Sequence, residues 1–106
     1  MTTTATSTTD QFIVLRDGRR LAYAEFGDPA GHPVVFLHGW CGSRLTRHPD
    51  DHLTASLGVR LITVDRPGVG LSDRRPGRRL LDWPDDLRQL MDALAIDCVG
   101  LVGHSG

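Results

Sequence analysis

Three short apolar runs without polar alternation constrain the fold of this chain more than any other feature. They are VVFL at residues 34–37, VRLITV at residues 59–64 and CVGLVG at residues 98–103. Runs of this kind are typical of strands that are buried on both faces, as in a parallel sheet. Parallel strands need helical crossovers, which are right-handed in almost all proteins. The pattern therefore predicts an α/β fold in the order strand, helix, strand, helix, strand.

Both connecting segments carry the signals of helices. In residues 49–58, Pro49 suits the first helical position, and Asp50 and Asp51 complement the helix dipole. Leu53 and Leu57, four residues apart, are expected to face the sheet. The second helix is expected to begin at Asp82 as its N-cap. Its apolar stripe at helical spacing consists of Trp83, Leu87, Leu90, Met91 and Leu94.

An antiparallel hairpin is expected before these strands. Residues 11–27, QFIVLRDGRRLAYAEFG, place two strand-like runs around Asp17-Gly18, a pair that suits a type I′ turn. Residues 1–10 are expected to form a disordered tail, because they are polar and lack the basic and apolar regions of a secretory signal. No apolar stretch approaches the roughly 20 residues that span a bilayer.

Composition narrows the classes of function. The chain has 106 residues and a formal net charge of −1, so it lacks the basic excess that nucleic-acid or membrane-surface binding needs. The arginine-rich residues 74–79 are interpreted as a solvated loop, with an anionic partner as the alternative. Cys41 and Cys98 form neither a disulfide framework nor a zinc motif. We expect a soluble, cytoplasmic protein with no metal.

Polar residues follow each of the three central strands. His38 and Gly39 follow the first, Asp65 follows the second, and the sequence GHSG ends the third at Ser105 and Gly106. In α/β sheets, chemistry collects outside the carboxyl ends of the strands, so these residues are expected to share one edge. A serine two residues after a glycine at a strand end can be a nucleophile on a sharp turn.

Three segments in this order resemble the α/β-hydrolase family, in particular its serine hydrolases of esterase and peptidase type. They are FLHGWCGS at residues 36–43, VDRPGVGLSD at residues 64–73 and VGHSG at residues 102–106. The resemblance implies that residues 11–106 form a partial domain, the N-terminal half of the α/β-hydrolase fold. The family's acid and catalytic histidine follow the nucleophile in chain order, beyond the matched segments.

The resemblance also implies roles for single residues. Ser105 corresponds to the nucleophile, and the backbone N–H groups of Trp40 and Gly106 correspond to the oxyanion donors. The structural positions of the motifs are His38, Gly39, Asp65 and Gly103. Asp65 is expected to bond loop amides, and Cys41 stands where many relatives carry proline. No cofactor is implied.

Other readings of these motifs are less favoured. Gly70-Leu71-Ser72 also spells Gly-x-Ser, but it follows a loop and not a strand. His104 neighbours Ser105, and adjacent residues on a turn point apart, so direct proton transfer between them is disfavoured. The glycines after Asp65 do not open a helix, as a phosphate-binding fingerprint requires.

A metal site is the alternative for His48 and His52, which bracket two aspartates. His48 precedes a proline, so it is expected to lie before the helix and not on its face. No third group of ligands accompanies the pair, and a helix N-terminus is the favoured interpretation.

Two hypotheses follow for function. In the first, the chain is part of a cofactor-free serine hydrolase for small-molecule esters or amides, cut before its acid and histidine. A serine nucleophile excludes relatives that attack through a carboxylate. In the second, the chain is an inactive fragment or an interaction module. An exposed sheet edge would then favour self-association.

Overall fold

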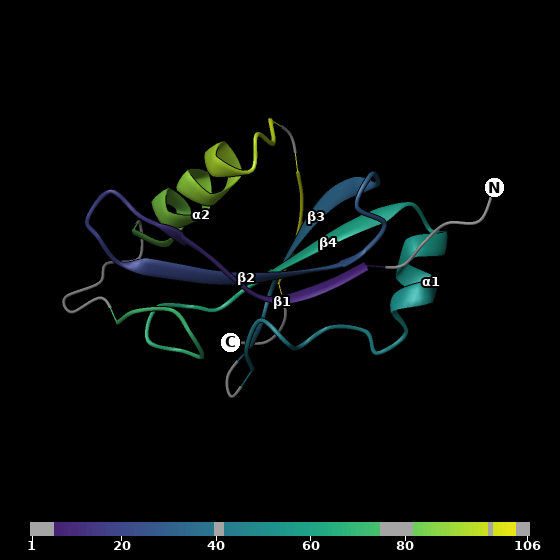
Figure 1. The fold of residues 1–106 in the computed structure, drawn as a ribbon, viewed down its shortest axis with the longest axis horizontal. Coiled ribbons are helices and arrows are strands. Elements are labelled where there is room, and N and C mark those ends of the chain that lie inside the picture. The colour runs from purple at the N-terminus through teal and green to yellow at the C-terminus, as the bar shows by residue number, and fades with distance from the viewer. Residues whose placement is uncertain (1–5, 40–41, 75–81, 98, 104–106) are drawn as a thin grey trace.

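The computed structural model describes residues 6–39, 42–74, 82–97 and 99–103. Its single sheet (Figure 1) has the strand order β1 (Thr6–Val14), β2 (Arg20–Gly27), β4 (Val59–Val64), β3 (His32–Leu37) and β5 (Gly100–Gly103). β2 is antiparallel to β1 and β4, whereas β3 is parallel to β4 and β5. A hairpin followed by parallel strands with helical connections confirms the expected α/β fold.

The two helices cover different sides of the sheet. α1 (Asp51–Ser56) connects β3 to β4 and lies near one end of the strands, whereas α2 (Asp82–Ala93) lies along the opposite side (Figure 1). Among the described residues, no helix is long and apolar enough to cross a membrane.

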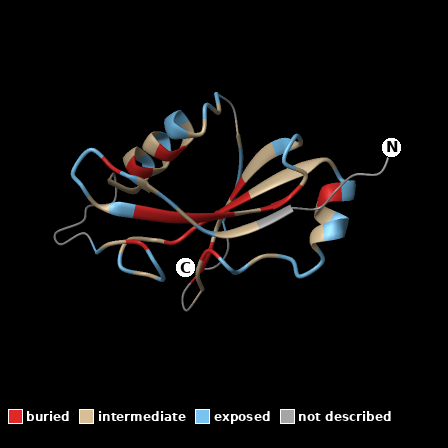
Figure 2. Ribbon diagram, in the orientation of Figure 1, coloured by how far each residue is buried: buried red, intermediate tan, exposed pale blue. Residues whose placement is uncertain are grey.

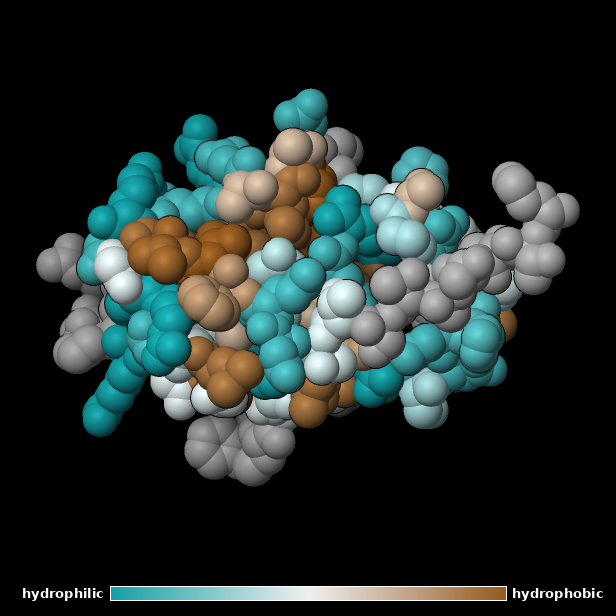
Figure 3. Space-filling view, viewed as in Figure 1, coloured by the Kyte–Doolittle hydropathy of each residue, from teal (hydrophilic) through white to brown (hydrophobic). Residues whose placement is uncertain are grey.

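The expected apolar stripe of α2 forms the main core with the sheet. Leu90 is fully buried among Leu21, Ile62 and Val64, and its neighbours on the stripe pack against the same cluster. Burying one such side chain contributes roughly 1.5–3 kcal/mol. Buried residues run along the middle of β2 in Figure 2, and apolar side chains gather between α2 and the sheet in Figure 3.

The hairpin turn differs from the expected type I′ turn. The Gly18 N–H donates to the Leu15 carbonyl at 2.9 Å, and the Leu15 N–H donates to the Arg19 carbonyl at 2.8 Å. Gly18 has a φ of +88°, but Asp17 does not share a positive φ, as a type I′ turn demands. The loop is a turn that ends in a bulge glycine, so the type I′ prediction is wrong.

Both outer strands differ in extent from the sequence pattern. β1 begins at Thr6, and Thr6 and Thr8 pair with Gly27 and Glu25. Residues 6–10, expected in a tail, therefore belong to the sheet, because β-branched threonines fit a pleated surface. β5 begins at Gly100, and Cys98 lies outside the described residues.

The expected orientation of α1 is wrong. Leu53 and Leu57 are exposed, and Ala55 is the buried residue of the helix. The helix approaches β2 so closely that a Cβ on Gly27 would lie 2.8 Å from the Thr54 Cγ2. Only a small side chain fits between them, and residues two positions from Ala55 point to the opposite face.

The start of α1 also differs from the expectation. Asp50, not Pro49, is the residue at the boundary, and its side chain accepts a hydrogen bond from the Leu53 N–H at 3.1 Å. Pro49 therefore precedes the cap. An aspartate cap satisfies one of the free N–H groups of the first turn, which a proline cannot do.

Candidate active site

The carboxyl ends of the three parallel strands lie at one level of the sheet. Leu37, the last residue of β3, is paired with Val64 at the end of β4 and with Gly103 at the end of β5. His38 and Asp65 therefore leave the sheet side by side, as the sequence predicts. The chain reaches this same edge at Gly103, just before Ser105.

His38 is buried and joins the connections that follow β3 and β4. Its Nδ1 lies 2.8 Å from the Gly39 carbonyl, and its Nε2 accepts a hydrogen bond from the Arg66 N–H at 3.2 Å. A carbonyl on one side and an N–H on the other fix the neutral tautomer with the proton on Nδ1. Both ring nitrogens therefore contact backbone groups.

Asp65 is fully buried and fastens the two connections to each other. Its carboxylate accepts hydrogen bonds from the Arg44 N–H at 2.6 Å, the Arg44 Nη1 at 2.9 Å and the Leu71 N–H at 2.9 Å. The expectation that Asp65 bonds loop amides is confirmed. The guanidinium supplies the opposite charge that a carboxylate needs in so buried a place.

Gly70 lies against this carboxylate with a φ of +56°. A Cβ at this position would lie 2.2 Å from the Asp65 Oδ2, so no larger residue fits without displacement of the aspartate. Gly70 therefore allows this segment to pass close to a buried carboxylate. A phosphate would be repelled by the Asp65 carboxylate at this position. The contact therefore agrees with the sequence-based argument against a phosphate-binding loop after Asp65.

Ser72, the serine of the second Gly-x-Ser, is buried in a structural position. Its hydroxyl accepts from the Ala22 N–H and donates to the Asp65 carbonyl, each at 2.8 Å. The Ser72 hydroxyl thereby bridges the Ala22 N–H of β2 and the Asp65 carbonyl after β4. Its hydroxyl both accepts from and donates to backbone groups. These contacts agree with the interpretation of Ser72 as a structural residue and not a nucleophile.

Asp73 closes the same segment onto β2. Its carboxylate accepts from the Arg20 N–H at 2.7 Å and from the Arg20 Nη2 at 3.2 Å, and its own N–H donates to the Arg20 carbonyl at 2.9 Å. The backbone N–H and then the guanidinium of Arg20 lower the pKa of Asp73 from its ordinary value. The segment after β4 is thus held at both of its ends.

Several predicted site residues lie outside the described residues. They are Trp40, Cys41, His104, Ser105 and Gly106. The predicted site residues that the structure describes are His38, Gly39, Asp65 and Gly103.

Comparison with known proteins agrees with this geometry. Residues 32–105 match the model of a family described as "alpha/beta hydrolase fold". The chain belongs to this α/β-hydrolase family. The matched region includes β3, β4, β5, the first two segments on which the resemblance was based and residues 102–105 of the third.

Individual proteins that are similar to this chain are named for different activities. A non-heme chloroperoxidase of Streptomyces lividans is 33% identical over 88% of this chain and 34% of its own length. An epoxide hydrolase of Caballeronia sordidicola is 34% identical over 98% of this chain and 32% of its own length. A crystal structure of an assigned aryl esterase from Burkholderia cenocepacia is 35% identical, with a TM-score of 0.68, over 89% of this chain and 36% of that chain. The chain spans about a third of the length of these relatives.

Arg44 is the residue of this α/β-hydrolase edge that sequence reasoning missed. It is buried, and it contacts Asp65, Asp10 and the carbonyl of Thr9. The sequence offers no clear signal for it, since arginine is frequent in this chain. Its place six positions after His38, next to Gly42 and Ser43, is the one local hint.

His48 and the aspartates near α1 make local contacts. The His48 Nδ1 accepts from the Asp50 N–H at 3.1 Å, and Asp51 is paired with Arg47 at 3.1 Å. Within the described ranges, no group of three or more potential ligands is close enough to hold a metal ion. The helix N-terminus interpretation of this segment agrees with these contacts.

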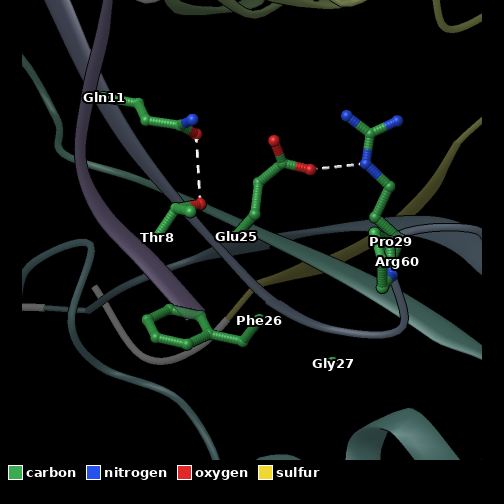
Figure 4. A pocket seen from close by; sticks show the side chains of 7 residues that line it. All are labelled: Thr8, Gln11, Glu25, Phe26, Gly27, Pro29 and Arg60. Atoms are coloured by element: carbon green, nitrogen blue, oxygen red, sulfur yellow. Dashed lines mark hydrogen bonds and ion pairs between the residues drawn. The ribbon is translucent and has the colours of Figure 1, made fainter. Parts of the chain in front are cut away.

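A cavity of about 140 Å³ lies at the opposite end of the strands (Figure 4). It is lined by Thr8, Gln11, Glu25, Phe26, Gly27, Pro29 and Arg60. Glu25 and Arg60 form an ion pair across it, and the Thr8 hydroxyl donates to Gln11 at 3.3 Å. Arg60 lies near the start of β4, whereas Asp65 follows its end, so this cavity is separate from the candidate active site.

Proposed function

We propose that the chain carries the nucleophile and the oxyanion loop of a serine hydrolase that acts on ester or amide-type bonds. Ser105 is the nucleophile in this proposal, and the N–H groups of Trp40 and Gly106 are the oxyanion donors. The observation that carries it is the register of Leu37 with Val64 and Gly103, which brings three strand ends to one edge. Membership of the α/β-hydrolase family supports the same assignment.

The chemistry would proceed by acyl transfer. The Ser105 Oγ attacks the carbonyl carbon of the substrate while a histidine accepts its proton, and the carbonyl oxygen gains the negative charge. Two N–H donors stabilise this charge in the transition state, and the loss of one typically costs about 10²–10³ in kcat. The leaving group then takes the proton, and water releases the acyl group by the same steps.

The histidine and its acid partner are proposed to follow Gly106 in the complete protein, in the family's chain order. His38 is unsuitable as the base, because both of its ring nitrogens contact backbone groups. We therefore expect the isolated chain of residues 1–106 to hydrolyse p-nitrophenyl acetate no faster than its Ser105→Ala variant. A serine-dependent rate in the isolated chain would contradict this assignment of the base.

The activity test uses the protein expressed from its complete reading frame. We expect Ser105→Ala to lower kcat for p-nitrophenyl acetate by several powers of ten. The matched control is Ser56→Ala, since Ser56 is exposed on α1 and its hydroxyl contacts the Leu53 carbonyl. Equal loss in both variants, or full activity in Ser105→Ala, would refute the proposal.

We also propose that the chain by itself self-associates through β5. Leu101 and Val102 on this strand are 62% and 47% exposed, and β3 is its partner in the sheet order. An apolar strand with one free edge is a template for pairing with another chain. Sedimentation should show association that Leu101→Asp weakens and that Leu57→Asp, at an exposed position just after α1, does not. A monomer at all concentrations would contradict it.

A further inference from the structure

Arg44 occupies an unusual position between three parts of the chain. Its side chain is 9% exposed, and its nitrogen atoms contact three different acceptors. Nη1 donates to the Asp65 Oδ2 at 2.9 Å, Nη2 donates to the Asp10 Oδ1 at 2.9 Å, and Nε donates to the Thr9 carbonyl at 2.5 Å. One guanidinium thus joins the end of β4 to the edge strand β1.

The backbone of Arg44 is fixed at the same point. Its N–H donates to the Asp65 Oδ1 at 2.6 Å, and its carbonyl accepts from the Thr63 hydroxyl of β4. Both the side chain and the main chain of Arg44 therefore hold the connection after β3 against the end of β4. Removal of the guanidinium would leave the backbone bonds but would deprive the buried Asp65 of its counter-charge.

The contact with β1 depends on an irregularity in that strand. The pairing of β1 with β2 shifts register between Thr8 and Gln11, and Thr9 and Asp10 lie within the shift. A bulge leaves its extra residue out of the ladder and turns its polar groups elsewhere. Here the Thr9 carbonyl and the Asp10 carboxylate both meet Arg44. The bulge of β1 therefore supplies two acceptors for the Arg44 side chain, which comes from the connection after β3.

The connection that Arg44 fixes contains Trp40. On either side of residues 40–41, the Gly42 N–H donates to the Gly39 carbonyl at 3.0 Å, and further along the Thr46 N–H donates to the Ser43 carbonyl at 2.9 Å. A Cβ on Gly42 would lie 2.9 Å from the His38 Cβ, so Gly42 packs closely against His38. Movement at Arg44 would be transmitted to Gly42, because only Ser43 separates the two residues.

We propose that Arg44 is a positioning residue for hydrolysis, which holds the oxyanion loop in place by joining Asp65 to the Thr9–Asp10 bulge of β1. The catalytic part of this inference rests on the proposed function, because the donor concerned is the Trp40 N–H. A backbone donor acts on charge that develops in the transition state, so its displacement lowers kcat and leaves KM almost unchanged. A purely structural arginine would instead change the folded fraction alone.

The test compares four variants of the protein expressed from its complete reading frame. Arg44→Met removes the guanidinium, Arg44→Lys retains the charge without the fork, and Asp10→Asn removes the outer carboxylate only. Arg47→Met is the matched control, because Arg47 lies in the same connection but pairs with Asp51 and stacks on Phe26 at 4.0 Å.

Two measurements are made on each variant. The first is native-state hydrogen exchange at the N–H groups of Gly42, Thr46 and Leu71, with Ile62 of β4 as the internal reference. The second is kcat and KM for p-nitrophenyl acetate, with kcat divided by the concentration of titrated active sites.

Arg44→Met should exchange at least about tenfold faster at the loop amides than at Ile62, and its kcat should fall about 10–100-fold with KM within about threefold. Arg44→Lys should lie between wild type and Arg44→Met, Asp10→Asn should show a smaller change of the same kind, and Arg47→Met should match wild type. If Arg44→Met does not fold, Arg44→Lys and Asp10→Asn decide the question. Unchanged loop exchange, or an equal effect in Arg47→Met, would overturn the proposal.

The two proposals fail in different ways. Full activity in Ser105→Ala would refute the hydrolase assignment, while loop exchange would still report whether Arg44 holds the connection. Activity that depends on Ser105, with a kcat per active site unaffected by Arg44→Met, would refute the role of Arg44 alone.

Discussion

Replacement of Asp65 by asparagine tests the structural centre of the candidate site. The carboxylate is fully buried and accepts hydrogen bonds from Arg44 and Leu71 on both of its oxygens. Asparagine has one acceptor oxygen, so its amide group must face at least one of these N–H donors. The variant also leaves the buried Arg44 without its main counter-charge.

The expected cost follows from these contacts. Breaking a buried ion pair by removal of one partner typically costs about 3–5 kcal/mol. A chain of 106 residues has a free energy of unfolding of roughly 5–15 kcal/mol, so Asp65→Asn should remove a large part of it. For an m-value of about 1–3 kcal/mol/M, the urea midpoint should fall by more than about 1 M.

Urea titration followed by circular dichroism provides the assay. Asp51→Asn is the control, because the pair of Asp51 with Arg47 keeps 21–25% of its side-chain exposure, so its loss should cost less than the loss of the fully buried Asp65. The double variant Arg44→Met with Asp65→Asn should lose less than the sum of the single losses, because it removes both charges. A midpoint for Asp65→Asn equal to that of Asp51→Asn would refute the reasoning.

Three further predictions concern stability. Gly70→Ala should lower the free energy of unfolding by more than about 1 kcal/mol in urea titration, since φ is +56° and the new Cβ would lie 2.2 Å from a buried carboxylate oxygen. Leu90→Ala should cost about 2–5 kcal/mol in the same assay, whereas Leu57→Ala, 70% exposed, should change it by less than about 0.5 kcal/mol. The lowered pKa of Asp73 should stabilise the fold above about pH 4 and lose this contribution as the pH falls through the folded pKa, so the urea midpoint of Asp73→Asn should depend less on pH in that range.

The sheet and the edge that carries the candidate site were largely predictable from the sequence. Apolar runs without alternation fix which segments are buried strands, and the handedness of crossovers fixes the side on which each helix lies. The stripe of α2 follows helical spacing over three turns, and it packs as expected around Leu90. His38 and Asp65 meet at one edge because strand order alone demands it.

Features that depend on distant contacts were not predictable in the same way. The role of Arg44 arises from a bulge in β1 more than thirty residues earlier in the chain. The orientation of α1 depends on its close approach to Gly27, which local periodicity does not contain. The turn at Gly18 depends on how the hairpin strands twist, and one dipeptide suits more than one turn type.

The most direct test of the central claim is the position of a covalent adduct. The protein expressed from its complete reading frame is treated with a fluorophosphonate, which reacts with activated serines, and the adduct is located by tandem mass spectrometry. The assignment predicts one adduct on Ser105, absent in Ser105→Ala and retained in Ser56→Ala. An adduct on Ser72 or another serine, or none on a protein with hydrolase activity, would contradict it.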